Sequence, residues 1–269
     1  MCERKGTPIP FWKVYKLTVS GFALNYATPV GLMGGEPYRI MELTPYVGAS
    51  KATSSVILYV MMHIFSHFCF WFFSIFLYLA LRPVDIAMGT ILAVVGAVSL
   101  LAIYFFMKGY KNGMAVRTLK LLQHIPFIKE WAKRFSENKR EALERVDSQI
   151  AELHKQRRST FYASLSLEFM ARIIGCLEVY FILNILTTDV SFPACILIMA
   201  FTSLFANLFF FSPMQLGARE GGFALAVGGL AIPGAFGVYT GLITRVRELI
   251  WIVIGVLLMK VGNGTPANK

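Results

Sequence analysis

The sequence predicts an all-α polytopic integral membrane protein that carries two re-entrant, broken-helix motifs in an inverted repeat. Three observations predict this class. Of the 269 residues, 56% are hydrophobic and only 15% are charged, with a mean hydropathy of +0.60, so a water-soluble surface could hardly be covered. Several apolar runs reach the roughly 20 residues that a helix needs to cross a bilayer core. A short pattern containing Gly and Pro also occurs near both ends of the chain.

We expect a single membrane domain over residues 1–269, built from five consecutive parts. These are an N-terminal segment with the first re-entrant motif (1–51), two transmembrane helices (52–107), a basic amphipathic segment (108–158), two further transmembrane helices (159–211), and the second re-entrant motif with the last transmembrane helix (212–269).

The apolar runs set the helices of this plan. The basic start of the chain lacks the apolar stretch and cleavage site of a secretory signal, so internal helices are expected to direct insertion. Residues 11–28 are only weakly apolar. We expect two pairs of crossings, in each of which one helix runs outward and the next runs back to the cytoplasm. A last inward crossing is expected to end at Lys260. The four crossings before the last are residues 52–81, 86–107, 160–186 and 191–211.

The segment 108–158 is basic, with thirteen Lys and Arg against six Asp and Glu. Cytoplasmic loops carry such an excess, so we place this segment in the cytoplasm of a multi-pass cell-membrane protein. Its apolar residues recur at helical spacing, which predicts an amphipathic helix over 127–158 on the inner membrane surface. A coiled-coil partner is the alternative, and the membrane context argues against nucleic-acid binding.

The Gly- and Pro-containing pattern reads P-x-x-L-x-x-x-E in both copies, from Pro29 to Glu36 and from Pro213 to Glu220. Each copy holds a GxxxG and an adjacent arginine. Pro removes a helix donor and Gly lets the backbone bend, and paired interruptions of this kind indicate a transporter binding site. The backbone positions that we single out are Pro29, Gly31, Gly34, Gly35, Pro213, Gly217 and Gly221. The alternative is structural: GxxxG packs helices, and each glutamate stabilises a helix N-terminus.

Ionisable residues inside apolar segments are costly and are functional candidates. Those expected to line or support a polar path are Glu36, Arg39, Arg219, Glu220, Arg245, Arg247 and Glu248. Arg39 and Arg219 adjoin flexible backbone, and the guanidinium of an arginine can bind a lipid phosphate through two parallel hydrogen bonds. The i,i+4 pair of Glu168 and Arg172 is expected to bond internally, as is the i,i+3 pair of Arg245 and Glu248.

Other chemistry is not indicated by the sequence. His63 and His67 share a helix face, but no third metal ligand stands near them, so we expect buried hydrogen-bonding histidines and no metal. Neither an ATP-binding loop nor a hydrolase elbow occurs. We therefore expect no catalytic residue and no cofactor.

The stretches PVGLMGGEPYR, SPMQLGAREGG and TRVRELIW together resemble the flippase-like transmembrane family of lysylphosphatidylglycerol synthases, in order over nearly the whole chain. The resemblance implies movement of lipids, including aminoacylated phosphatidylglycerol, between leaflets. Family members usually have further helices before the first motif, so the chain resembles a short or N-terminally truncated member. Met214 and Gln215 stand where glycines are common. The synthase domain of some members has no counterpart here, so lysyl transfer is not implied.

The function that we expect is that of an integral membrane lipid translocator, with membrane phospholipids as its partners. Two alternatives stay open. One is a membrane enzyme acting on a lipid head group, with His63 or Glu36 as base. The other is a non-catalytic membrane partner of a lipid-biosynthesis enzyme, docked through residues 127–158. The sequence also leaves open whether the chain forms a homo-oligomer.

Overall fold

A computed structural model describes residues 9–27, 34–112, 148, 158–187, 190–209 and 215–260, without the side chains of 109–112 and 158. Within these ranges the regular secondary structure is all α-helical, with no strand. The predicted all-α class is therefore confirmed. The amphipathic helix expected over 127–158, and the motif residues Pro29, Gly31 and Pro213, lie outside the described residues.

The helices follow the predicted plan closely. In chain order they are α1 (Phe11–Ala27), α2 (Gly35–Val47), α3 (Ala49–Leu81), α4 (Ile86–Asn112), α8 (Arg158–Leu186), α9 (Phe192–Leu208), α10 (Ala218–Gly228) and α11 (Gly234–Lys260). The starts or ends of the long helices differ from the expected ranges by only a few residues. The helix α2 was not separately predicted, because the expected motif region covered it.

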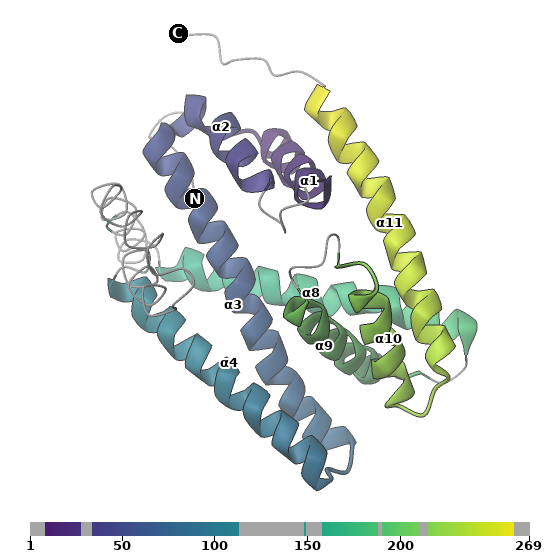
Figure 1. Ribbon diagram of the computed structural model, residues 1–269. Coiled ribbons are helices and arrows are strands. Elements are labelled where there is room, and N and C mark those ends of the chain that lie inside the picture. The colour runs from purple at the N-terminus through teal and green to yellow at the C-terminus, as the bar shows by residue number, and fades with distance from the viewer. Residues whose placement is uncertain are drawn as a thin grey trace, which may run out of the picture.

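Three of the described helices, α3, α4 and α8, contain segments long and apolar enough to cross a membrane. The turn between α3 and α4 is stabilised by Asp85, whose carboxylate accepts a hydrogen bond from the backbone N–H of Met88 at 2.7 Å. Figure 1 shows α3 and α4 running side by side in opposite directions. The helix α9 is shorter, with 17 residues, and α11 carries three charged residues near its middle.

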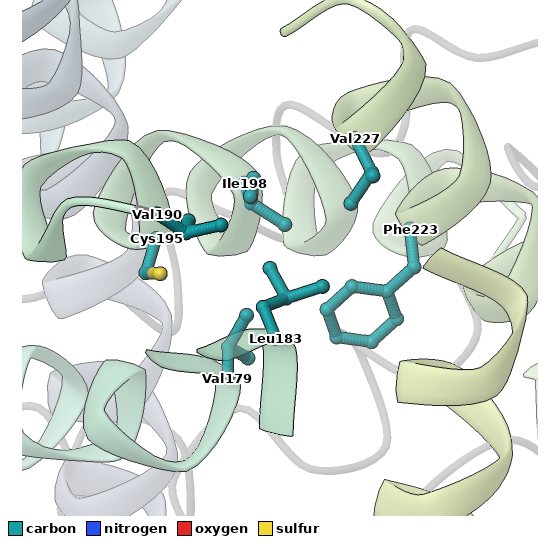
Figure 2. Packing of buried hydrophobic residues seen from close by; sticks show 7 residues of the cluster. All are labelled: Val179, Leu183, Val190, Cys195, Ile198, Phe223 and Val227. Carbon is teal, nitrogen blue, oxygen red and sulfur yellow. The ribbon is translucent and has the colours of Figure 1, made fainter. Parts of the chain in front are cut away.

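Packing of α8, α9 and α10 forms one of the buried clusters. Phe223 and Val227 of α10 are 0% exposed and point towards Leu183 of α8, as Figure 2 shows. Ile198 of α9 closes the cluster from a third side. The α8–α9 turn is held by Asn184, whose amide donates to the carbonyl of Val190 at 3.0 Å. This cluster fixes the position of α10, the helix that begins within the second motif.

The other two clusters combine aromatic, sulfur-containing and aliphatic side chains. In the first, Phe65 of α3 stacks on Phe106 of α4 with ring centroids 4.5 Å apart. In the second, Trp71 of α3 packs with residues of α8 and α9, and its indole donates to the hydroxyl of Ser203 at 2.9 Å. These contacts make α3 the helix that α4, α8 and α9 all touch.

The first and last described helices pack against each other. The hydroxyl of Ser20 in α1 donates to the carbonyl of Gly255 in α11 at 3.1 Å. A Cβ at Gly255 would overlap Ala23 and the backbone of Val19, so only glycine permits this approach. Figure 1 shows the two ends of α11 beside different partners, α10 near its start and α1 farther along. Residues near both ends of the sequence are thereby brought together.

Candidate functional site

Glu36 of the first motif and Arg39, which follows it, form a mostly buried charged pair on α2. Arg39 donates to the carboxylate of Glu36 at 3.1 Å, and the amide of Asn25 in α1 donates to the same oxygen at 3.1 Å. The Asn25 carbonyl oxygen in turn accepts from the backbone N–H of Gly35 at 2.7 Å. Arg39 is 8% exposed. Asn25 therefore fixes both the start of α2 and the carboxylate that neutralises the arginine.

Two glycines create the space for this pair. A Cβ at Gly21 would overlap the guanidinium of Arg39, which lies across α1 at this point. A Cβ at Gly35 would overlap the backbone carbonyl of Gly21. The guanidinium makes only long contacts to the carbonyls of Leu17 and Thr18, at 3.5 and 3.4 Å. The close α1–α2 approach thus places a buried arginine whose remaining hydrogen bonds are weak.

Two residues of the second motif, Arg219 and Glu220, form two crossed ion pairs with α11. Arg245 of α11 donates to Glu220 of α10 at 2.8 Å, and Arg219 of α10 pairs with Glu248 of α11. The other carboxylate oxygen of Glu220 accepts from the backbone N–H of Gly217 at 2.9 Å, so Glu220 caps α10. This is the N-terminal role that the structural alternative gave to this glutamate.

Glu248 is the centre of the second network. It is 3% exposed, lies 3.7 Å from a guanidinium nitrogen of Arg245, and accepts from the hydroxyl of Tyr26 in α1 at 3.4 Å. The predicted i,i+3 pair of Arg245 and Glu248 is confirmed. Arg247 approaches Glu248 at 3.7 Å and bonds more closely to Glu178 of α8 at 2.5 Å. Helices α1, α8, α10 and α11 are all tied into this network.

The two motifs share a glycine N-cap but differ in the backbone conformation of that glycine. Each leads into a helix with glycine as its N-cap and a glutamate in its first turn, Gly34 with Glu36 and Gly217 with Glu220. Gly217 has a left-handed φ of 78°, whereas Gly34 is right-handed at −79°. The GxxxG interpretation holds for Gly35, which packs on α1, but a Cβ at Gly221 would meet nothing within 4 Å.

A cavity of about 530 Å³ lies between α1, α2, α3 and α8. Most of its wall is apolar, and its charged members are Arg39 and Glu168. Tyr59 of α3 also lines it, with its ring centroid 4.9 Å from the guanidinium carbon of Arg39. The volume falls within the roughly 300–1,000 Å³ of small-molecule pockets, which are likewise apolar with a few polar groups. Of the seven predicted path residues, only Arg39 lines this cavity.

The expected bond between Glu168 and Arg172 is wrong. The Arg172 guanidinium instead crosses to α3 and donates to Ser66 at 2.7 Å and to the His63 carbonyl at 2.9 Å. Glu168 lies 3.3 Å from the Nδ1 of His63. Spacing along one helix predicted a pair, but side chains of the neighbouring helix offer both groups closer partners. His63 is also not buried, because 49% of its side chain is exposed.

Sequence reasoning missed the roles of Tyr59 and Glu168 in the cavity wall. Tyr59 is an uncharged residue in a long apolar helix, so nothing in the pattern distinguished it from packing. Glu168 had a signal, an acid inside an apolar run, but it was assigned to Arg172. The predicted residues fall into two separate groups: Glu36 and Arg39, and the network of Arg219, Glu220, Arg245, Arg247 and Glu248.

Long apolar helices enclosing charged side chains define an α-helical membrane protein. The model of the family described as the lysylphosphatidylglycerol synthase transmembrane region matches residues 1–255. The chain belongs to this family, as the resemblance of its motifs predicted. Comparisons with curated proteins and with solved structures gave no match.

Proposed function

We propose that this protein translocates a phospholipid or a related amphipathic lipid between the two leaflets of the cell membrane. The observation that carries the proposal is the cavity beside α3, where apolar walls surround Arg39. In such apolar surroundings a lipid phosphate needs a cationic group that can donate hydrogen bonds to it, and the acyl chains need an apolar wall. The proposal includes multiple membrane crossings and a cytoplasmic 108–158 segment.

Arg39 suits a phosphate for two reasons. Its side chain is 9% exposed, and its carbonyl contacts are long, so a phosphate oxygen would improve its hydrogen bonding. Tyr59 lies against the guanidinium and limits where it can move. Both arginines pair with a glutamate, Arg39 with Glu36 and Arg219 with Glu248, but only Arg39 lines the cavity, so Arg219 suits a phosphate less well. The phosphate role predicted for both arginines is therefore assigned to Arg39 alone.

The proposal retains the inverted repeat and the two re-entrant motifs. Its support is the shared glycine N-cap and first-turn glutamate of α2 and α10. In this scheme the Glu248 network joins α1 to helices of the second half, and the cavity lies between α1, α2 and α3 of the first half and α8 of the second. Labelling of single cysteines by a membrane-impermeant maleimide tests the topology, because equivalent positions after each motif must be reached from opposite sides.

Leaflet exchange in liposomes tests the function. Purified protein is reconstituted with acyl-labelled phosphatidylglycerol, phosphatidylethanolamine or lysylphosphatidylglycerol, and the label in the outer leaflet is bleached over time. Arg39→Gln is expected to abolish exchange of every lipid. Arg39→Lys is expected to retain part of it, since lysine keeps the positive charge but cannot donate two parallel hydrogen bonds to one phosphate. Arg82→Gln, at an exposed turn, is the matched control.

Three outcomes separate the proposal from its alternatives. Exchange that depends on Arg39, with lipids unchanged by mass spectrometry, supports translocation. A chemically altered head group would instead make the protein an enzyme. If folded wild type exchanges no lipid and Arg39→Gln binds lipid normally, the role of a non-catalytic partner of a biosynthetic enzyme replaces the proposal.

A further inference from the structure

The carboxylate of Glu36 meets Arg39 through only one of its two oxygens. Oε1 accepts from the guanidinium at 3.1 Å and from the side-chain amide of Asn25 at 3.1 Å. Oε2 is buried and has no hydrogen-bond partner among the described residues. An arginine and a carboxylate frequently form two parallel hydrogen bonds instead. The charged pair on α2 is therefore a one-point contact, and the second oxygen of the acid is kept away from the guanidinium.

Asn25 of α1 holds the carboxylate in this orientation. Its side-chain oxygen accepts from the backbone N–H of Gly35 at 2.7 Å. Since a backbone N–H can only donate, this contact assigns the amide oxygen to Gly35 and the amide nitrogen to Glu36. The missing side chain at Gly35 makes room for the contact, because a Cβ there would lie 3.0 Å from the Asn25 oxygen. Both ends of one amide are thus fixed by the start of α2.

The one-point contact leaves Arg39 with donors to spare. A guanidinium has five N–H groups, and Glu36 takes one of them. Two more make only long contacts, at 3.5 and 3.4 Å, to the backbone carbonyls of Leu17 and Thr18, whereas a good N–H···O bond is no longer than about 3.2 Å. Arg39 is buried and lines the cavity. A phosphate oxygen in the cavity would therefore meet a neutralised arginine that still has N–H groups to donate.

The second motif shows the arrangement without a restraining amide. Asn207 of α9 precedes this motif, but its side chain donates to the carbonyl of Ser203 in its own helix at 2.7 Å. The carboxylate of Glu220 then accepts from two nitrogens of Arg245, at 3.2 and 2.8 Å. The acid that no asparagine contacts thus takes two donors of its arginine, whereas Glu36 takes one.

We propose that Asn25 is a positioning residue for the phosphate of the bound lipid. By restricting Glu36 to one oxygen, it keeps the counter-charge that allows Arg39 to stay buried and leaves donors for the phosphate. Carboxylate and phosphate both suit the parallel donors of a guanidinium, so a two-point contact with Glu36 would compete directly with the lipid. This inference rests on the proposed function and adds to it the residue that sets the affinity for the phosphate.

Lipid binding in detergent, measured by native mass spectrometry of the purified protein, tests the inference without transport. The probes are dioleoylphosphatidylglycerol and dioleoylglycerol, which has the same chains but no phosphate. Asn25→Ala is expected to weaken phosphatidylglycerol binding on the order of tenfold, the worth of one charge-assisted hydrogen bond, and to leave dioleoylglycerol binding unchanged. Asn207→Ala is the matched control and should bind both lipids like wild type. An equal loss for both lipids, or no loss, overturns the inference.

A double-mutant cycle with Glu36→Gln shows whether Asn25 acts through the acid. Glu36→Gln removes the competing charge, so in that background Asn25→Ala should change phosphatidylglycerol binding by less than about twofold. The same loss in both backgrounds overturns the inference. If Asn25→Ala does not fold, Asn25→Asp takes its place in the cycle, because it keeps an acceptor for the backbone N–H of Gly35 but cannot donate to Glu36.

Failure of the proposed function gives a different result from failure of this inference. If phosphatidylglycerol binding follows the expected pattern but no lipid exchanges between leaflets in liposomes, the proposed translocation fails and the positioning role of Asn25 stands. If lipid exchange depends on Arg39 but the cycle shows no coupling between Asn25 and Glu36, the proposed translocation stands and the positioning role fails.

Discussion

The hydroxyl of Tyr26 in α1 donates to the carboxylate of Glu248 in α11 at 3.4 Å, across 222 residues of sequence. The same carboxylate pairs with Arg219 of α10 and lies near Arg245. One buried acid thus joins α1 to the consecutive helices α10 and α11, which lie at the other end of the sequence. Its loss would leave the mostly buried Arg219 without its counter-charge, whereas Arg245 would keep Glu220.

Replacing Glu248 by Gln is expected to destabilise the protein strongly. Removing one partner of a buried ion pair typically costs about 3–5 kcal/mol, because the remaining charge is left unpaired. Thermal unfolding in detergent, followed by tryptophan fluorescence, measures the effect. Tyr26→Phe removes only one hydrogen bond and should cost about 1 kcal/mol. Equal unfolding midpoints for Glu248→Gln and wild type would show that the network does not stabilise the fold.

Gly35 and Gly221 are the second glycines of the two GxxxG patterns but should respond differently to alanine. A Cβ at Gly35 overlaps the backbone of α1, so Gly35→Ala must push two helices apart. A Cβ at Gly221 meets no atom within 4 Å, so Gly221→Ala should be tolerated. Thermal unfolding compares them. A greater loss of stability in Gly221→Ala would mean that the second motif packs on something that these contacts do not include.

Gly21→Ala is expected to impair lipid exchange without unfolding the protein. The new methyl group would occupy the position of the Arg39 guanidinium, which is the end of a flexible side chain and can move aside. The charge stays in the protein but leaves its place beside Tyr59. We expect exchange to fall by about tenfold or more, as displaced binding groups cost at least this much. Gly175→Ala, where a Cβ meets nothing within 4 Å, is the control.

Phe223→Ala is expected to destabilise the packing of α10. The ring is 0% exposed in the cluster of Figure 2, and a buried Phe→Ala change typically costs about 3–5 kcal/mol through the cavity that it leaves. Leu225→Ala on the same helix serves for comparison, since that side chain is 57% exposed. Similar unfolding midpoints for the two variants would contradict the assigned core.

The helices themselves could be predicted from sequence, because length and hydropathy are local properties. The ranges 52–81 and 86–107 lie within α3 and α4. The ion pair of Arg245 and Glu248 was also predictable, since i,i+3 spacing places both side chains on one face of a helix. The same reasoning failed for Glu168 and Arg172, because a neighbouring helix supplied His63 and Ser66 as closer partners.

The sequence by itself determined the all-α membrane class, the order of the helices and the candidate charged residues. Only the tertiary structure decided which of those residues share a site. Arg39 lines a cavity because Gly21 and Gly35 let α1 and α2 approach closely, whereas Arg219 pairs with Glu248 of the next helix, α11. Hydropathy reports the cost of placing a residue in lipid, but the partner that offsets this cost depends on how helices pack.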